Sequence, residues 1–339
     1  MAQPRDPESL DPDRSGIAIG ARHYAACMLQ RPTVGWLELE IGGLATSEPA
    51  AQAAAALRAA WPVGLRAAGF ALGAAGRLAG ATLDACADVV ARFSPSRISA
   101  ALAWPDAGFP NPALNLPYDD ATLVRVAADV DRLQVRLRRA VLIENPPGRP
   151  RATPFATDEA HFLAALVHRT GCGLMVDLAN LHVSSANRGG EPRQWLAALP
   201  GSAVGALRVA GHGMTAFADD TLLIADRSAP PGEAVWALHE AASRRFPGAP
   251  TLVAWDTGLL APLAAEAARA DRRRRAALDG GIAYAEPEFG SGGIVARSPA
   301  TADQRRGWLI SPGEPAARAA PDRAARVGGA AVAAETLRA

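Results

Sequence analysis

The chain contains no lysine, and all 35 of its basic residues are arginines. Schiff-base catalysis, the P-loop and lysine-base chemistry each need a lysine amine, so this absence excludes all three. Alanine is in excess, and we attribute both features to a GC-rich coding bias. With 34 acidic residues the formal net charge is +1. No bulk field therefore favours nucleic acid or an anionic membrane as a partner.

Cysteine is also scarce. Cys27, Cys86 and Cys172 are too few and too scattered for a disulfide framework or a thiolate zinc site, and they fit a reducing compartment. No run of about 18 uninterrupted apolar residues occurs, so no membrane span is expected. The polar first segment lacks the apolar core of a secretory signal. We therefore expect a cytoplasmic protein.

The sequence does contain a regular alternation of short apolar runs with helix-like segments. Eight runs predict strands, at residues 16–20, 34–40, 63–69, 97–104, 140–145, 173–180, 203–211 and 251–256. Helices are predicted at 47–60, 76–93, 119–139, 157–170, 191–199, 231–246 and 259–278. This alternation over roughly 250 residues is typical of an α/β fold of the (β/α)₈ TIM-barrel type. A doubly wound sheet is the alternative, but no glycine-rich phosphate loop follows the first run.

Composition divides the chain into three parts. Residues 1–15 form a predicted disordered tail, residues 16–278 the barrel, and residues 279–339 a second tail. The second tail is rich in glycine, proline and alanine, and we expect most of it to be disordered.

Charged and polar side chains gather where the predicted strands end, which is where barrel active sites lie. They are Glu38, Glu40, Arg66, Glu144, Asn145, Asp177, Asn180, His182, Arg188, Arg208, His212 and Asp256. Carboxylates on adjacent strands with a histidine nearby suit a divalent metal or a general acid–base pair. A structural ion-pair network, with Arg208 neutralising Glu144 and Asp177, accounts for the same residues equally well. Packing or solvent exposure accounts for the histidines within helix patterns, which are His161, His168 and His239.

Long stretches of the chain carry a family resemblance. They are RPTVGWLELE (31–40), LPYDDATLVRVAADVDRLQVRLRRAVLIENPP (116–147), RTGCGLMVDLANLHVSSANRGGEPRQWLAALP (169–200), LRVAGH (207–212) and LVAWD (252–256). In this order they resemble segments of the multinuclear non-haem iron-dependent oxidases, enzymes of the methanobactin-biosynthesis type that modify cysteines in ribosomally made peptides (RiPPs). The likeness implies a xylose-isomerase-like barrel with two or three irons held by histidines and carboxylates. A small partner protein commonly presents the peptide.

At the positions that match the family's metal ligands, this chain departs from the pattern. The resemblance implies histidines where Arg66, Arg188 and Arg208 stand. Other expected ligands and their neighbours are replaced at Gly42, Gly43, Leu44, Ala100, Ala101, Ala179 and Ala254. The matching residues that survive are Glu144, Asn145, Asp177, Asn180, His212 and Asp256. A guanidinium only donates hydrogen bonds, so it cannot ligate iron as a neutral imidazole does.

We therefore expect a pseudoenzyme without a cofactor, in which the barrel persists as a binding or regulatory module. Its partner would be a peptide, a small anion or a small protein of the peptide-modification type. Arg208 is predicted to face Glu144 and Asp177 in a bidentate pair, occupying the place of an iron. Arg66 and Arg188 are expected to pair with carboxylates likewise or to bind an anionic group.

Two enzymatic alternatives stay open. In the first, one divalent metal, iron or another, is held by Glu144, Asp177 and His212, with Asp256 or His182 assisting, in an oxidoreductase acting on peptide cysteine. In the second, Glu144 and Asp177 form the acid–base pair of a metal-free isomerase or lyase.

Overall fold

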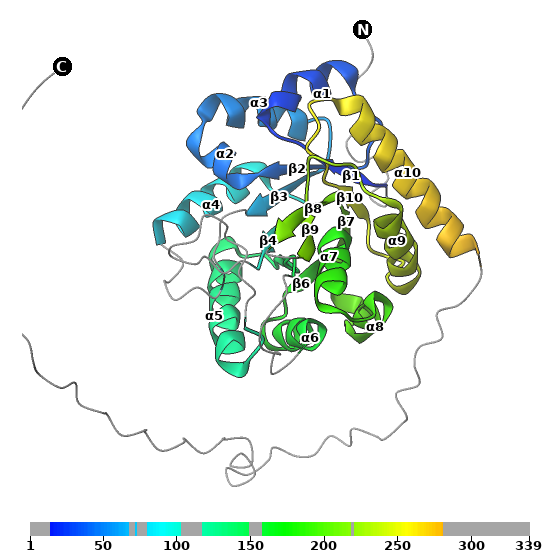
Figure 1. Cartoon of the computed structure of the whole chain (residues 1–339). Coiled ribbons are helices and arrows are strands. Elements are labelled where there is room, and N and C mark those ends of the chain that lie inside the picture. Colours follow the sequence, from blue (N-terminus) through cyan, green and yellow to red (C-terminus); the bar gives the residue numbers. More distant parts are fainter. Residues whose placement is uncertain are drawn as a thin grey trace, which may run out of the picture. The chain divides into compact units, whose positions relative to one another are not determined.

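The computed structural model describes residues 14–67, 72, 80–102, 117–148, 158–217 and 220–280. Within them, parallel strands close into a barrel in the order β1-β10-β7-β6-β5-β4-β3-β2 (Figure 1). The strands are β1 (Gly16–Ala18), β2 (Leu37–Glu40), β3 (Val63–Ala67), β4 (Arg97–Ala101), β5 (Leu142–Glu144), β6 (Gly173–Asp177), β7 (Val204–Val209) and β10 (Thr251–Val253). Every predicted strand is present, and the predicted (β/α)₈ barrel is confirmed.

Helices surround the barrel (Figure 1). They are α1 (Tyr24–Gln30), α2 (Ile41–Thr46), α3 (Glu48–Arg58), α4 (Gly80–Phe93), α5 (Asp120–Leu137), α6 (Glu159–Thr170), α7 (Leu178–Arg188), α8 (Pro192–Ala198), α9 (Glu233–Arg245) and α10 (Leu260–Asp279). Ser47, Asp119 and Asp158 each accept a hydrogen bond from a backbone N–H in the first turn of α3, α5 and α6. Such caps satisfy donors that the helix itself leaves unpaired.

The segment after β6 corrects the sequence analysis. Residues 178–180 were expected to extend the strand, with His182 and Arg188 in a loop, but 178–188 form the helix α7. The Asp177 carboxylate accepts a hydrogen bond from the Asn180 backbone N–H at 2.9 Å, and this cap ends the strand and starts the helix. His182 and Arg188 are therefore held on a helix.

A two-stranded hairpin, which the sequence did not predict, follows β7. Its antiparallel strands are β8 (His212–Phe217) and β9 (Asp220–Ala225). The Asn187 side chain on α7 ties β9 in place, donating to the Leu223 carbonyl at 2.8 Å and accepting from the Leu223 N–H at 3.0 Å. His212, expected at the end of strand seven, begins the hairpin instead.

An apolar plug closes the barrel interior toward the start of the strands. Trp36, which directly precedes β2, is buried and packs with Met175, Ala206 and Leu252. Glycine is required beside it, because a Cβ on Gly16 would lie 2.5 Å from the indole ring. The plug is therefore a close-packed floor, and the Arg97 guanidinium stacks on it, 4.2 Å from the centroid of the Trp36 ring.

Most of the predicted tails lie outside the described residues. Of the first tail, residues 14 and 15 are described, and the Ser15 N–H donates to Asp271 on α10 at 2.8 Å. Of the second, the description ends at Gly280, one residue after α10. All three cysteines are free and buried. No helix in the described part of the chain is long and apolar enough to cross a bilayer.

Candidate functional site at the barrel mouth

Arg208 on β7 lies at the centre of the barrel mouth and is completely buried. Its Nη2 donates to both carboxylate oxygens of Glu38, at 2.7 and 2.9 Å, and to Oε1 of Glu144, at 3.0 Å. The sulfur of Met175, at the edge of the apolar floor, lies 3.3 Å from the same nitrogen. One guanidinium nitrogen thus bridges carboxylates from β2 and β5.

This geometry corrects the prediction for Arg208 in two respects. The second carboxylate is Glu38, not Asp177, and a single nitrogen carries the contacts instead of a bidentate fork. The strand register does place Asp177 beside Arg208, but the Asp177 carboxylate caps α7. Burial raises the pKa of Asp177, against the opposing effect of Arg208 and of the Asn180 N–H.

Glu144 on β5 is surrounded by hydrogen-bond donors. Arg66 on β3 binds it in a bidentate pair, Nε to Oε1 at 2.9 Å and Nη2 to Oε2 at 3.2 Å. The Ser99 hydroxyl donates to Oε1 at 3.1 Å. Burial by itself would raise the pKa of Glu144, but Arg208 and then Arg66 outweigh it and hold the pKa at about 2. Glu144 is therefore ionised and fully engaged by protein donors.

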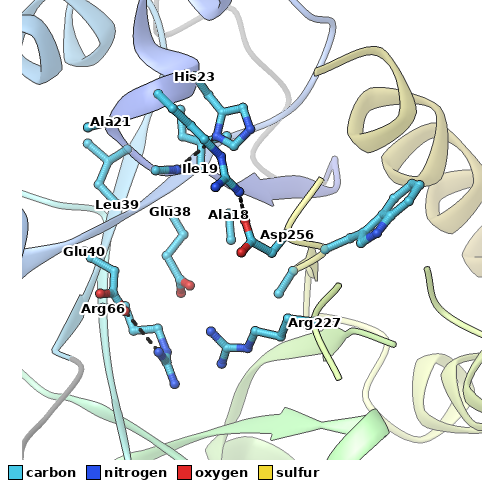
Figure 2. Close-up of a pocket in the computed structure, with 14 residues that line it drawn as sticks. Ala18, Ile19, Ala21, His23, Glu38, Leu39, Glu40, Arg66, Arg227 and Asp256 are labelled. Atoms are coloured by element: carbon cyan, nitrogen blue, oxygen red, sulfur yellow. Dashed lines mark hydrogen bonds and ion pairs between the residues drawn. The ribbon is translucent and has the colours of Figure 1, made fainter. Parts of the chain in front are cut away.

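A cavity of about 460 Å³ opens above this cluster. Figure 2 shows Arg66 and Arg227 entering it from opposite sides, with Glu38 pointing into the space between them. Arg66 also donates to Glu40 at the rim, at 3.1 Å. Further along the rim, Arg22 forms an ion pair with Asp256. The apolar part of the lining includes Ala18, Ile19, Leu39 and Trp255.

Arg227 was not predicted from the sequence, because it lies in the connection from β9 to α9 and not at the end of a barrel strand. The Asp226 carboxylate accepts from the Ser228 N–H at 2.8 Å and from the Ser228 hydroxyl at 2.7 Å. These bonds close an Asx turn from Asp226 to Ser228, with Arg227 as its middle residue. The Arg227 side chain lines the cavity. The Asp-Arg-Ser triplet before a helix was the signal available in the sequence.

Arg188 was predicted to lie at the barrel mouth, but its side chain points to helix α6 instead. Its Nη2 donates to Glu159 on α6 at 3.1 Å, and the Tyr118 hydroxyl donates to the same oxygen at 2.6 Å. Burial raises the pKa of Glu159, against the pull of Arg188. This cluster borders a separate cavity of about 370 Å³, lined by residues of α6, α7 and α8. Arg188 thus pairs with a carboxylate, as expected, but with one away from the mouth.

Asn145 and Asn180 brace the backbone behind the site. The Asn145 side chain donates to the Asp177 carbonyl at 3.1 Å and accepts from the Asp177 N–H at 2.7 Å. The Asn180 side chain donates to the Asn145 carbonyl at 2.8 Å. These bonds join the ends of β5 and β6 to α7, which is a positioning role.

His182 and His212 contact each other edge to face, with ring centroids 4.6 Å apart. Burial and the neighbouring His212 ring lower the pKa of His182. Neither imidazole lines the mouth cavity.

The donor set of the mouth does not fit the iron cluster that the family resemblance implies. Glu38 and Glu144 are already bound by Arg208, and a guanidinium offers no lone pair to a metal. Within the described ranges, no three His, Cys, Asp or Glu side chains are grouped so that they could hold one metal ion. The trio of Glu144, Asp177 and His212 proposed for a single metal is therefore not assembled in this structure.

Comparison with known proteins places the chain in a family. The model of the RiPP precursor modification enzyme MbnB/TglH/ChrH matches residues 14–275. A UPF0276 protein of Bordetella bronchiseptica is 37% identical over 265 residues, covering 77% of this chain and 91% of that protein. A UPF0276 protein of Caulobacter vibrioides is 36% identical over 261 residues, covering 76% and 93%. The protein is a (β/α)₈ barrel, and it belongs to the MbnB/TglH/ChrH family of RiPP precursor modification enzymes.

Comparison with solved structures supports the fold assignment and nothing further. A D-psicose 3-epimerase crystallised in the presence of D-fructose superposes with a TM-score of 0.52 and 13% sequence identity, covering 78% of this chain and 99% of that one. At this identity the likeness concerns the barrel alone.

Proposed function

We propose that this chain is a member of the family that has lost the multinuclear iron chemistry and acts as a binding or regulatory module. The observation that carries the proposal is the position of Arg208, whose Nη2 lies within 3.0 Å of both Glu38 and Glu144. A positive charge is needed there because two buried carboxylates repel each other. The guanidinium supplies that charge without any redox chemistry.

An arginine suits this position because it supplies positive charge to two buried carboxylates. A buried carboxylate without a partner costs several kcal/mol, so removing a metal would leave Glu38 and Glu144 unstable. Arg208 and Arg66 together surround Glu144 with hydrogen bonds and hold its pKa at about 2. Glu144 therefore stays ionised. The cavity above the cluster remains open to a ligand or to a segment of a partner.

Metal titration tests this proposal. Protein purified without chelator or affinity tag is titrated anaerobically with Fe²⁺ and separately with Mn²⁺ in a calorimeter. We expect no stoichiometric binding, because protein cations already engage the surviving carboxylates. Saturable binding of one or more ions per chain, followed by oxidation of a peptide thiol in air, would favour the alternative of a reduced metal site.

Substitution of Glu144 addresses the metal-free alternative. If Glu144 is the partner of Arg208 and Arg66 and nothing more, Glu144→Gln lowers stability. If it serves as an acid or base, the same change abolishes a turnover that persists in EDTA. Asp177, the other member of that pair, is committed to the cap of α7 and does not line the cavity, which argues against the acid–base role.

A further inference from the structure

The carboxylates around the mouth cavity are already paired with arginines. Arg208 and Arg66 engage Glu38, Glu40 and Glu144, as described above. Arg22 engages Asp256 at the rim. The carboxylates that line the cavity therefore already have cationic partners.

Arg227 is an arginine of the cavity lining that has no such pairing. Its side chain lines the cavity, yet it forms no hydrogen bond or ion pair with any residue that the structure describes. Burial and repulsion by Arg208 and Arg66 lower its pKa, and Asp177 and Glu144 attract it only from beyond ion-pair distance. The arginines and carboxylates of the mouth are equal in number, but none of those carboxylates forms an ion pair with Arg227. The N–H donors of its guanidinium are therefore available to an anion that enters the cavity.

We infer that Arg227 is the anchor of a binding site for a small organic oxyanion. The planar guanidinium offers two parallel N–H donors, which match the two oxygens of a carboxylate or of a phosphate group. The cavity has about 460 Å³, a volume in the range of small-molecule sites. Ile19, Leu39 and Trp255 in its lining suit the hydrocarbon part of such a ligand. The inference rests on the proposed binding role and names its ligand class.

Arg227 is also a residue that can be changed without disturbing the barrel. Its backbone carbonyl accepts from the Asp256 N–H, and a substitution leaves that bond in place. Its side chain has no partner to lose among the described residues. The variant Arg227→Gln should therefore fold, with a melting temperature equal to or above that of the wild type.

The test is binding of three probes, acetate, benzoate and inorganic phosphate, measured by calorimetry against sodium chloride at equal ionic strength. We expect at least one probe to bind the wild type more tightly than chloride. Arg227→Gln should weaken that binding roughly tenfold or more, whereas Arg227→Lys retains part of it. The control is Arg193→Gln on α8, an exposed arginine outside the cavity lining, which should bind the probe like the wild type.

The probes separate the two sources of the oxyanion. Preference for acetate or benzoate assigns a carboxylate ligand, and preference for phosphate assigns a phosphate ester. The inference is overturned if no probe binds better than chloride, or if Arg227→Gln binds as well as the wild type. Metal content of the same preparation keeps the two proposals apart. Bound iron would contradict the proposed loss of iron chemistry but would not bear on the anion site. Metal-free protein that binds no probe would contradict the anion site alone.

Discussion

The two ends of one barrel interior are built on opposite principles. At the floor, Trp36 and its neighbours pack without an ion pair, and glycine makes room for the ring. At the mouth, Arg208 and Glu144 are just as deeply buried, but they are held by directional hydrogen bonds. Met175 belongs to the floor and touches Arg208, so the two regions meet at one side chain. The floor depends on close packing, with one guanidinium, that of Arg97, stacked on the Trp36 ring. The mouth depends on charge balance.

The largest effect is expected from removing the charge at the mouth. Arg208→Met leaves Glu38 and Glu144 buried without their shared cation, and we expect a loss of about 3–5 kcal/mol in the free energy of unfolding. Urea denaturation at pH 7 measures it. Adding Glu38→Gln and Glu144→Gln to the same chain should recover much of the loss. The account of the mouth fails if Arg208→Met alone is as stable as the wild type.

The floor should respond to volume instead. Gly16→Ala places a methyl group 2.5 Å from the Trp36 ring, and overpacking of this kind costs about 1–3 kcal/mol. We expect the loss to be the same at low and high salt, and to shrink when Trp36→Leu makes space. Gly43→Ala is the matched control, because a Cβ at this position in α2 meets nothing within 4 Å. A salt-dependent loss of stability in Gly16→Ala would contradict the prediction that the floor is stabilised by packing and the mouth by charge.

Acid should weaken the mouth and spare the floor. Folding lowers the pKa of Glu144 from 4.5 to about 2, so its contribution to stability is complete above pH 4.5 and is lost as the pH falls toward 2. The wild type should therefore lose its advantage over Glu144→Gln across that window, whereas Gly16→Ala should keep a constant difference from the wild type. Unfolding free energies at several pH values and fixed ionic strength give both comparisons. A Glu144→Gln deficit that stays constant down to pH 3 would contradict the low pKa.

The smallest effect belongs to Arg227. Burial of Arg227 and its repulsion by Arg208 and Arg66 outweigh its attraction by Asp177 and Glu144. We therefore expect Arg227→Gln to gain less than about 1 kcal/mol of stability, screened by salt. Thermal melts at low and high salt measure it. A clear loss of stability would mean that Arg227 has a structural role in the mouth.

The sequence predicted the barrel because strand and helix signals alternate along it, and each predicted strand lies in the sheet. It did not predict α7, because an apolar run and a capped helix share the residues after Asp177. Within the mouth, Arg208 and Glu144 were found as partners. The choice of Glu38 over Asp177 was not predictable, because it depends on which carboxylate the helix cap had already taken.

The remaining misses have the same cause. Arg188 was placed by its position after a strand, but the helical turn directs it to Glu159 on α6. Arg227 lies beyond a hairpin, so its spacing from any barrel strand carries no information about the mouth. Strand ends can be counted along a sequence, whereas the direction of a side chain on a connecting segment depends on the fold.

Elemental analysis tests the central claim most directly, namely that the Arg208 guanidinium carries the positive charge that the family's irons would supply. The protein is purified without chelator or affinity tag, and its iron, manganese and zinc are measured per chain. The account predicts less than about a tenth of an ion of any of these metals per chain, because Arg208 and Arg66 already engage the carboxylates of the mouth. One or more tightly bound irons per chain would contradict it.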